Sequence, residues 1–135
     1  MRWAVREYTN LNVLVVEDEP LIAADIEMIL LDLGHEVVGI ADTKARALSL
    51  IEDHALGMSF VDMNLRDGFT GVEIADALRG AGVPFFFVTG NPELVPADGG
   101  GAVGILRKPF SEQQIEQALA RLGSLGAVQG LSDKP

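Results

Sequence analysis

Short apolar segments that each end in polar residues recur along the chain, and this pattern restricts the possible folds more than any other feature of the sequence. The segment 58–61 leads into Asp62, 13–16 into Glu17 and Asp18, 86–88 into Thr89, and 105–106 into Arg107 and Lys108. Buried strands of a parallel sheet have this composition, and in open α/β sheets the reactive groups collect beyond the carboxyl ends of the strands. We therefore expect carboxylates, a hydroxyl and an amine at one edge of a sheet.

Helical patterns alternate with these strands. Strands are predicted near 11–16, 36–41, 58–62, 83–88 and 102–106, and helices near 20–33, 43–54, 72–79 and 111–122. Pro20 suits a first helical turn, Thr43 can cap the second helix, and Ser111 with Gln114 belongs to a capping-box pattern. Because this alternation requires parallel pairing and right-handed crossovers, we predict a flavodoxin-like, doubly wound (βα)5 sandwich with strand order 2-1-3-4-5.

Two segments have weaker signals. Between Gly90 and the fifth strand, Pro96 and the glycines at 99–101 oppose a regular helix, so we expect a short or mobile fourth helix. From Gly123 onward the Gly, Ser and Ala content predicts a frayed tail. The expected organisation is an N-terminal lead over 1–10, a folded domain over 11–123 and a flexible tail over 124–135, with no effector domain behind it.

Composition limits the class of protein. With 135 residues, 48% of them hydrophobic, the chain can form one domain with a substantial core, and no apolar run approaches the roughly 18 residues that a membrane span needs. The net charge of −10 disfavours direct binding to nucleic acid or anionic lipid. The chain has no cysteine and no secretion signal, which suits a reducing cytoplasm.

Other polar and aromatic residues have ordinary structural interpretations. His35 and His54 lie at no strand end and lack ligand spacing, so we expect surface or linker positions for both. The run of three phenylalanines at 85–87 is expected in the core, with one ring on the opposite face from its neighbours.

The predicted strand order brings Glu17, Asp18 and Asp62 together. Three carboxylates in one cleft repel one another unless a cation compensates, and an oxygen-rich set without cysteine or paired histidine favours Mg²⁺ over zinc. An aspartate can also act as a nucleophile and form an aspartyl-phosphate. Lys108 would supply a fixed positive charge, and the Thr89 hydroxyl could donate to a phosphoryl oxygen. These residues therefore indicate phosphoryl transfer.

Four motifs in order along the chain, Val-Val-Glu-Asp-Glu-Pro, Val-Asp-Met-Asn-Leu, Val-Thr-Gly and Arg-Lys-Pro-Phe, resemble those of the receiver domain of two-component response regulators. The resemblance extends from about 13 to 122. It implies that Asp62 receives a phosphoryl group from a histidine kinase or phosphotransfer protein. It also implies that Glu17, Asp18 and the Asn64 carbonyl help Asp62 to hold Mg²⁺, and that Thr89 and Lys108 bind the phosphoryl group.

The chain departs from the usual receiver pattern in informative ways. Ile105 stands where receivers commonly have the aromatic residue that turns inward on activation, and Arg66 stands where many have proline. The Phe-Val-Thr-Gly sequence ending at Gly90 is similar to the Phe-Ala-Thr-Gly signature of a receiver subgroup that lacks this aromatic and often works with HWE-type histidine kinases. The resemblance also implies a cis peptide bond before Pro109.

Three function classes follow. The first is a stand-alone receiver that signals to a downstream protein target and is not a classical enzyme. The second is a receiver-like binding module that works without phosphorylation. The third is a haloacid-dehalogenase-type phosphatase, which should open with Asp-x-Asp after the first strand, where this chain has Glu17-Asp18-Glu19. A flavin-binding role has still weaker support, because the first loop has no Ser/Thr/Gly-rich sequence that could bind a phosphate.

Overall fold

The sheet is formed by five parallel strands in the order β2-β1-β3-β4-β5, as predicted. The computed structural model describes the backbone of residues 10–133 and the side chains of residues 10–123. The strands are β1 (Asn12–Val16), β2 (Glu36–Ala41), β3 (Met58–Asp62), β4 (Phe85–Thr89) and β5 (Gly104–Arg107). Within the described part the α-helices are α2 (Pro20–Asp32), α3 (Lys44–Asp53), α4 (Gly71–Gly80) and α5 (Glu112–Asp133). Most of the predicted 1–10 lead lies outside the described residues.

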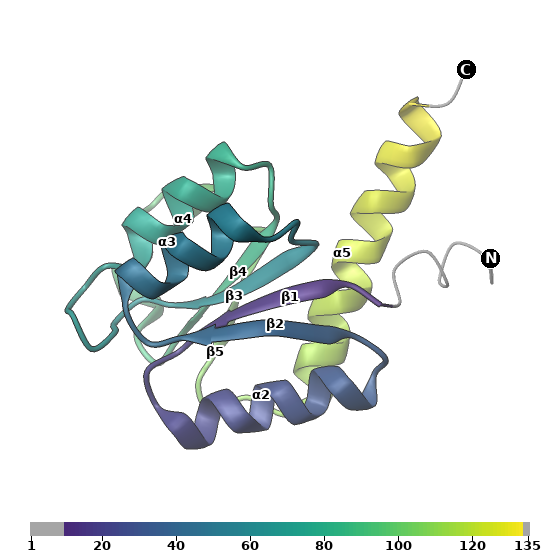
Figure 1. Ribbon diagram of the computed structural model, residues 1–135. Helices are drawn as coiled ribbons and strands as arrows, with labels where there is room; N and C mark the ends of the chain where they lie inside the picture. Colours follow the sequence, from purple (N-terminus) through teal and green to yellow (C-terminus); the bar gives the residue numbers. More distant parts are fainter. Residues whose placement is uncertain (1–9, 134–135) are drawn as a thin grey trace.

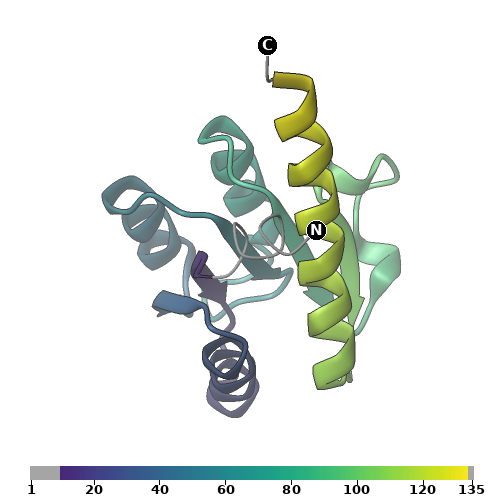
Figure 2. The ribbon, with the colours of Figure 1, turned by 90° about the vertical axis from the view of Figure 1, so that its right-hand side faces the viewer.

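The helices cover both faces of the sheet and give three layers (Figure 1). Helices α3 and α4 pack on one face, where Ala47, Leu50 and Ile74 join a core with Leu14 and Val61. Helices α2 and α5 pack on the other face around a second core, whose members include Ile26, Leu30, Phe60, Phe86 and Ile115. The two views in Figures 1 and 2 agree on this arrangement. Strands β3 and β4 are therefore buried on both faces, in accordance with their mostly apolar sequences.

Local sequence signals account for the helix boundaries. Pro20 opens α2, and the Thr43 hydroxyl accepts a hydrogen bond from the Arg46 amide at the start of α3. At the start of α5, the Gln114 amide donates to Ser111 Oγ at 3.2 Å and the Ser111 amide donates to Gln114 Oε1 at 2.8 Å. The predicted capping box is therefore present.

The fourth helix was expected to be short or mobile, and the described segment between β4 and β5 forms no α-helix. Two short 3₁₀ turns, η1 (Pro92–Leu94) and η2 (Gly99–Gly101), connect β4 to β5 where the (βα)5 pattern would have an α-helix. Proline interrupts a helical hydrogen-bond ladder, and Gly99, Gly100 and Gly101 all have positive φ, at 81°, 61° and 84°. The chain therefore crosses from β4 to β5 in irregular turns.

Helix α5 also continues past the predicted end at Gly123, through Asp133 (Figure 2). Isolated glycines cost a helix only about 1 kcal/mol each relative to alanine, and no proline interrupts the segment before Pro135. The predicted helix end was therefore wrong, whereas the flexibility of 124–135 stays a prediction. No helix among the described residues is long and apolar enough to cross a bilayer.

His35 lies in the connection between α2 and β2, a linker position as predicted, but not at the surface, and the aromatic prediction is confirmed. His35 is buried, and its Nδ1 accepts a hydrogen bond from the Leu11 amide at 3.1 Å, so it joins the α2–β2 turn to the start of β1. Burial lowers the pKa of His35. Phe85 and Phe87 belong to one core and Phe86 to the other, as strand alternation predicts.

Candidate phosphoryl and metal site

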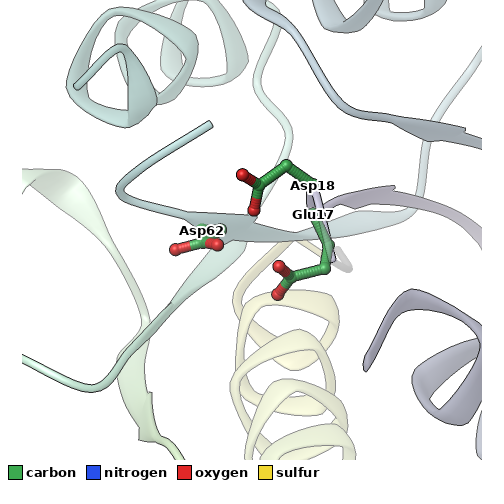
Figure 3. Close-up of side chains that lie close together, drawn as sticks. All are labelled: Glu17, Asp18 and Asp62. Carbon is green, nitrogen blue, oxygen red and sulfur yellow. The ribbon is translucent and has the colours of Figure 1, made fainter. Parts of the chain in front are cut away.

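Three carboxylates meet at the carboxyl edge of the sheet (Figure 3). Strands β1 and β3 are neighbours, with Val16 paired to Val61, so Glu17 and Asp62 follow at adjacent positions. One oxygen from each of Glu17, Asp18 and Asp62 lies within 4.8 Å of the others. Glu17 and Asp62 are buried, and Asp18 is half-buried. The topology thus brings together acids that are separated by more than forty positions in the chain.

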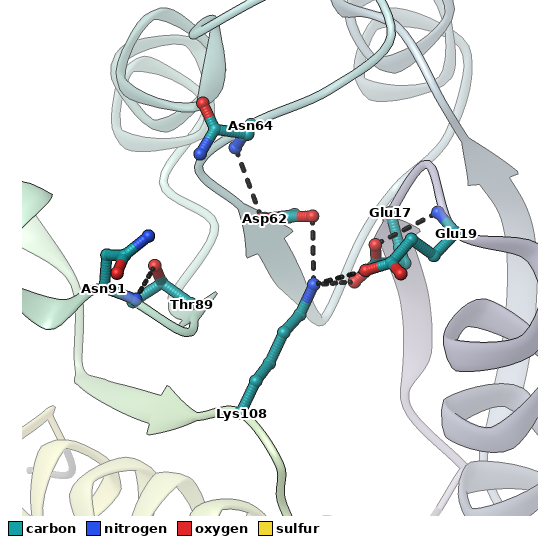
Figure 4. A network of polar contacts seen from close by, with 7 residues as sticks. All are labelled: Glu17, Glu19, Asp62, Asn64, Thr89, Asn91 and Lys108. Atoms are coloured by element: carbon teal, nitrogen blue, oxygen red, sulfur yellow. Dashed lines mark hydrogen bonds and ion pairs between the residues drawn. The ribbon is translucent and has the colours of Figure 1, made fainter.

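Lys108 pairs with two of these carboxylates, Glu17 and Asp62, and with Glu19 (Figure 4). Its Nζ lies 3.1 Å from Asp62 Oδ2, 3.0 Å from Glu17 Oε1 and 3.4 Å from Glu19 Oε2. The lysine follows β5, and its amide donates to the Thr89 carbonyl at 2.9 Å, so the main chain fixes its position. The ammonium therefore partly neutralises the acidic cluster.

Burial and neighbouring charges shift the pKa values at this site. Burial raises the pKa of Glu17 from 4.5 to about 7, with a further increase from nearby Asp62, and the hydrogen-bonding influence of Lys108 opposes these effects only in part. For Lys108, burial lowers the pKa, but the ion pairs with Glu17 and Asp62 outweigh burial and raise it. A proton on Glu17 thus relieves the repulsion that a metal ion would otherwise offset.

The donor set fits a hard cation. Glu17 Oε1 is buried and has no hydrogen-bond partner among the described residues, because Lys108 Nζ lies within ion-pair distance without good hydrogen-bond alignment. This buried oxygen has an ion pair with Lys108 but no hydrogen bond within the described part of the chain, and it lies close to carboxylate oxygens of Asp18 and Asp62, so it could serve as a metal ligand. Carboxylate oxygens with room for water ligands suit Mg²⁺. The residues present therefore fit the predicted metal.

Thr89 and Asn64 lie near Asp62 (Figure 4). The buried Thr89 hydroxyl accepts a hydrogen bond from the Asn91 amide at 2.9 Å, which leaves its own proton available to donate. The Asn64 amide donates to Asp62 Oδ1 at 3.2 Å and so orients the aspartate. Among the described residues, the Thr89 side chain makes no hydrogen bond with Lys108 or Asp62, and Thr89 is joined to Lys108 through the main chain.

Comparison with known proteins identifies the family. The family model of the response regulator receiver domain matches residues 13–120. The chain belongs to the receiver domain family. It is 32% identical over 113 residues to the phyllosphere-induced regulator PhyR of Methylorubrum extorquens, covering 82% of this chain and 42% of that protein. It is also 32% identical over 126 residues to the transcriptional regulatory protein PdtaR of Mycobacterium tuberculosis, covering 88% of this chain and 62% of that protein.

Solved structures give the same result. The receiver domain of PhyR from Erythrobacter litoralis is 31% identical with a TM-score of 0.77, covering 84% of this chain and 90% of that one. SdrG from Sphingomonas melonis Fr1 is 36% identical with a TM-score of 0.73, and the match covers 84% of this chain and 96% of SdrG. The chain spans less than two thirds of the length of its curated relatives. The receiver domain family, to which the chain belongs, is a signalling module of two-component systems and not a class of classical enzymes.

Ile105 and Arg66, the two residues that depart from the usual receiver pattern, both lie at least partly exposed at the surface. Ile105 lies on β5 beside Phe87 and is 46% exposed, so its side chain stands partly outward. Arg66 is exposed on the loop after β3. The Lys108–Pro109 bond is cis, as the resemblance implied.

Two residues of the receiver site were missed by the sequence analysis. Glu19 pairs with Lys108, and the only sequence signal was its place in the acidic run after β1. Gly71 opens α4 where a Cβ would lie 2.6 Å from the Asp62 carbonyl oxygen and 2.7 Å from Met63 Cα. Only glycine lets α4 approach β3 this closely, and the turn-like sequence around it did not reveal this.

Proposed function

We propose that this receiver accepts a phosphoryl group on Asp62 from a histidine kinase or phosphotransfer protein in a Mg²⁺-dependent reaction. The observation that supports the proposal most strongly is the set of contacts around Asp62. Its carboxylate is buried, lies within 4.8 Å of Glu17 and Asp18, and pairs with Lys108 at 3.1 Å. A structural aspartate has no need of two further acids and a lysine held in place by the main chain.

Each residue has a proposed role. An oxygen of Asp62 attacks phosphorus as the phosphorus–nitrogen bond of a phosphohistidine breaks, and the imidazole takes the electron pair of that bond. Bound Mg²⁺, held by Glu17, Asp18, Asp62 and the Asn64 carbonyl, would offset charge on the phosphoryl oxygens. The Lys108 ammonium, which now pairs with Glu17 and Asp62, would bind a phosphoryl oxygen instead. The Thr89 hydroxyl, already placed by Asn91, donates to another.

The partners are proteins. The similarity to PhyR and to the Phe-Ala-Thr-Gly pattern supports an upstream kinase of HWE type and a cytoplasmic location. The relative from Bartonella quintana, 29% identical, is described as an anti-anti-sigma factor, which favours a protein as the downstream target here. The net charge of −10 opposes direct contact with nucleic acid. The output is a changed set of protein contacts.

Phosphorylation with a small acyl phosphate tests this proposal. We expect the intact mass to rise by one phosphoryl group with Mg²⁺ present, and to stay unchanged with a chelator or in Asp62→Asn. Asp98→Asn, the same change at an exposed site on the β4–β5 connection, is the control and should label like the parent. Labelling of Asp62→Asn at the parental rate would contradict the proposal and would favour the phosphorylation-independent module. Because the chain belongs to the receiver domain family, the haloacid-dehalogenase alternative is no longer supported.

A further inference from the structure

The loop that follows Asp62 is a small closed hairpin. The Leu65 amide donates to the Gly68 carbonyl at 2.9 Å, and the Gly68 amide returns a bond to the Leu65 carbonyl at 3.0 Å. Gly68 has φ of 114°, which favours glycine at this turn, and Leu65 is buried in the core beneath. The hairpin carries the Asn64 carbonyl that is proposed to bind Mg²⁺.

The hairpin tip is tied to the junction between β2 and α3. Asp67 Oδ2 accepts from the Lys44 amide at 2.9 Å, and its Oδ1 accepts from Thr70 Oγ1 at 3.1 Å. Lys44 is the first residue of α3, so Asp67 satisfies an amide that the helix leaves without a partner and places negative charge at the positive helix end. Arg66 adds two bonds to Asp42: its amide reaches the carbonyl at 3.1 Å and its guanidinium reaches the carboxylate at 3.0 Å.

The same junction also holds the other arm of the metal site. The Glu17 amide donates to the Ala41 carbonyl at 2.9 Å, one residue before the carbonyl that binds Arg66. Ala41 and Asp42 therefore fix the main chains on both sides of the pocket. The separation between Glu17 and the hairpin is set by this shared support.

We propose that Arg66 and Asp67 are positioning residues that clamp the hairpin to α3 and thereby hold the Asn64 carbonyl where Mg²⁺ needs it. This inference rests on the proposed function. Mg²⁺ demands near-ideal octahedral geometry, so a small displacement of one ligand lowers its affinity. Loss of an outer-shell partner typically costs about 10- to 100-fold in metal affinity, and we expect about tenfold weaker binding for Asp67→Ala.

For Arg66→Ala, an electrostatic effect and loss of the clamp would change the Mg²⁺ affinity in opposite directions. Removing a cation near an acidic pocket would tighten Mg²⁺ binding if electrostatics alone decided the affinity. Loss of the clamp would weaken it, by about twofold because the exposed ion pair is weak and the Arg66 amide keeps its bond to Asp42. Arg66→Ala thus separates the two explanations by the sign of the change.

The experiment measures the Mg²⁺ dissociation constant by calorimetry for the parent, Asp67→Ala and Arg66→Ala. Thr43→Ala is the matched control, because it removes a cap of the same helix α3, the bond from Arg46, without a contact to the hairpin. In the metal-free proteins, hydrogen exchange at the Leu65 and Gly68 amides reports how firmly the hairpin is held. We expect faster exchange in both clamp variants and parental exchange in the control.

The outcomes separate this inference from the function on which it rests. It holds if Asp67→Ala weakens Mg²⁺ binding about tenfold, Arg66→Ala does not tighten it and Thr43→Ala leaves it within twofold of the parent. It is overturned if the Asp67→Ala affinity is parental, if Thr43→Ala weakens binding as much, or if Arg66→Ala tightens it. A parent that binds no Mg²⁺ would instead refute the proposed function and this inference together.

Discussion

Replacing Glu17 by glutamine should change how the stability of the metal-free protein depends on pH. Glu17 is buried and its pKa lies at about 7 in the folded state, above the value of 4.5 expected in the unfolded chain. Between those values the folded protein binds the proton more tightly than the unfolded chain does. The free energy of unfolding therefore falls as pH rises toward 7, and the loss is complete above it.

The size of the effect follows from the same numbers. Between pH 5.5 and 8 the titration of Glu17 should remove about 2 kcal/mol from the free energy of unfolding, at about 1.4 kcal/mol for each pH unit up to 7. Glutamine stays neutral, so Glu17→Gln should lack this loss. The free energy of unfolding of the variant, taken relative to that of the parent, should therefore rise by about 2 kcal/mol between pH 5.5 and pH 8.

Urea unfolding monitored by circular dichroism, with a chelator present, measures this difference. Glu19→Gln is the control, since Glu19 also pairs with Lys108 but its side chain is 61% exposed. Addition of Mg²⁺ at pH 8 should stabilise the parent and have much less effect on Glu17→Gln. Parallel stability curves for parent and Glu17→Gln across this pH range would refute the reasoning.

Three further predictions concern packing, charge and the buried histidine. Gly71→Ala should lower the free energy of unfolding by about 1–3 kcal/mol through overpacking against Asp62, whereas Gly80→Ala in the same helix, with nothing within 4 Å, should be neutral or stabilising in the same urea titration. Lys108→Met should destabilise the metal-free protein at pH 8 by about 3–5 kcal/mol, and Mg²⁺ should restore much of this in thermal melts. Because burial lowers the pKa of His35, the folded protein holds this ring neutral, and the free energy of unfolding should fall as the pH falls. His35→Gln cannot take up this proton, so urea titrations should show a smaller fall for the variant than for the parent.

The sequence was most informative where the physical signal is local or repeated. Mostly apolar runs ending in polar residues marked β3 and β4, and alternation with helices determined the parallel order. Parallel strands end at one edge, so the meeting of Glu17, Asp18 and Asp62 followed from the strand order alone. Lys108 joined them because β5 ends at that same edge.

The sequence failed where distant contacts decide the structure. His35 looked like a turn residue, and only the approach of the chain before β1 gives its ring a hydrogen-bond partner. Glu19 and Gly71 owe their roles to Lys108 and to the Asp62 backbone, which no spacing reveals. The β4–β5 connection is different, because its proline and three glycines are a local signal that already opposed a regular helix, and two short 3₁₀ turns are found there.

The most direct test of the central claim is to map the phosphoryl group on the protein. The chain would be incubated with Mg²⁺ and a phosphorylated histidine kinase of HWE type, then digested and sequenced by mass spectrometry, with hydroxylamine lability identifying an acyl phosphate. The account predicts one phosphoryl group, on Asp62. A stable modification on another residue, such as Asp18 or Asp67, or no transfer from a kinase that phosphorylates a second receiver in the same reaction, would contradict it.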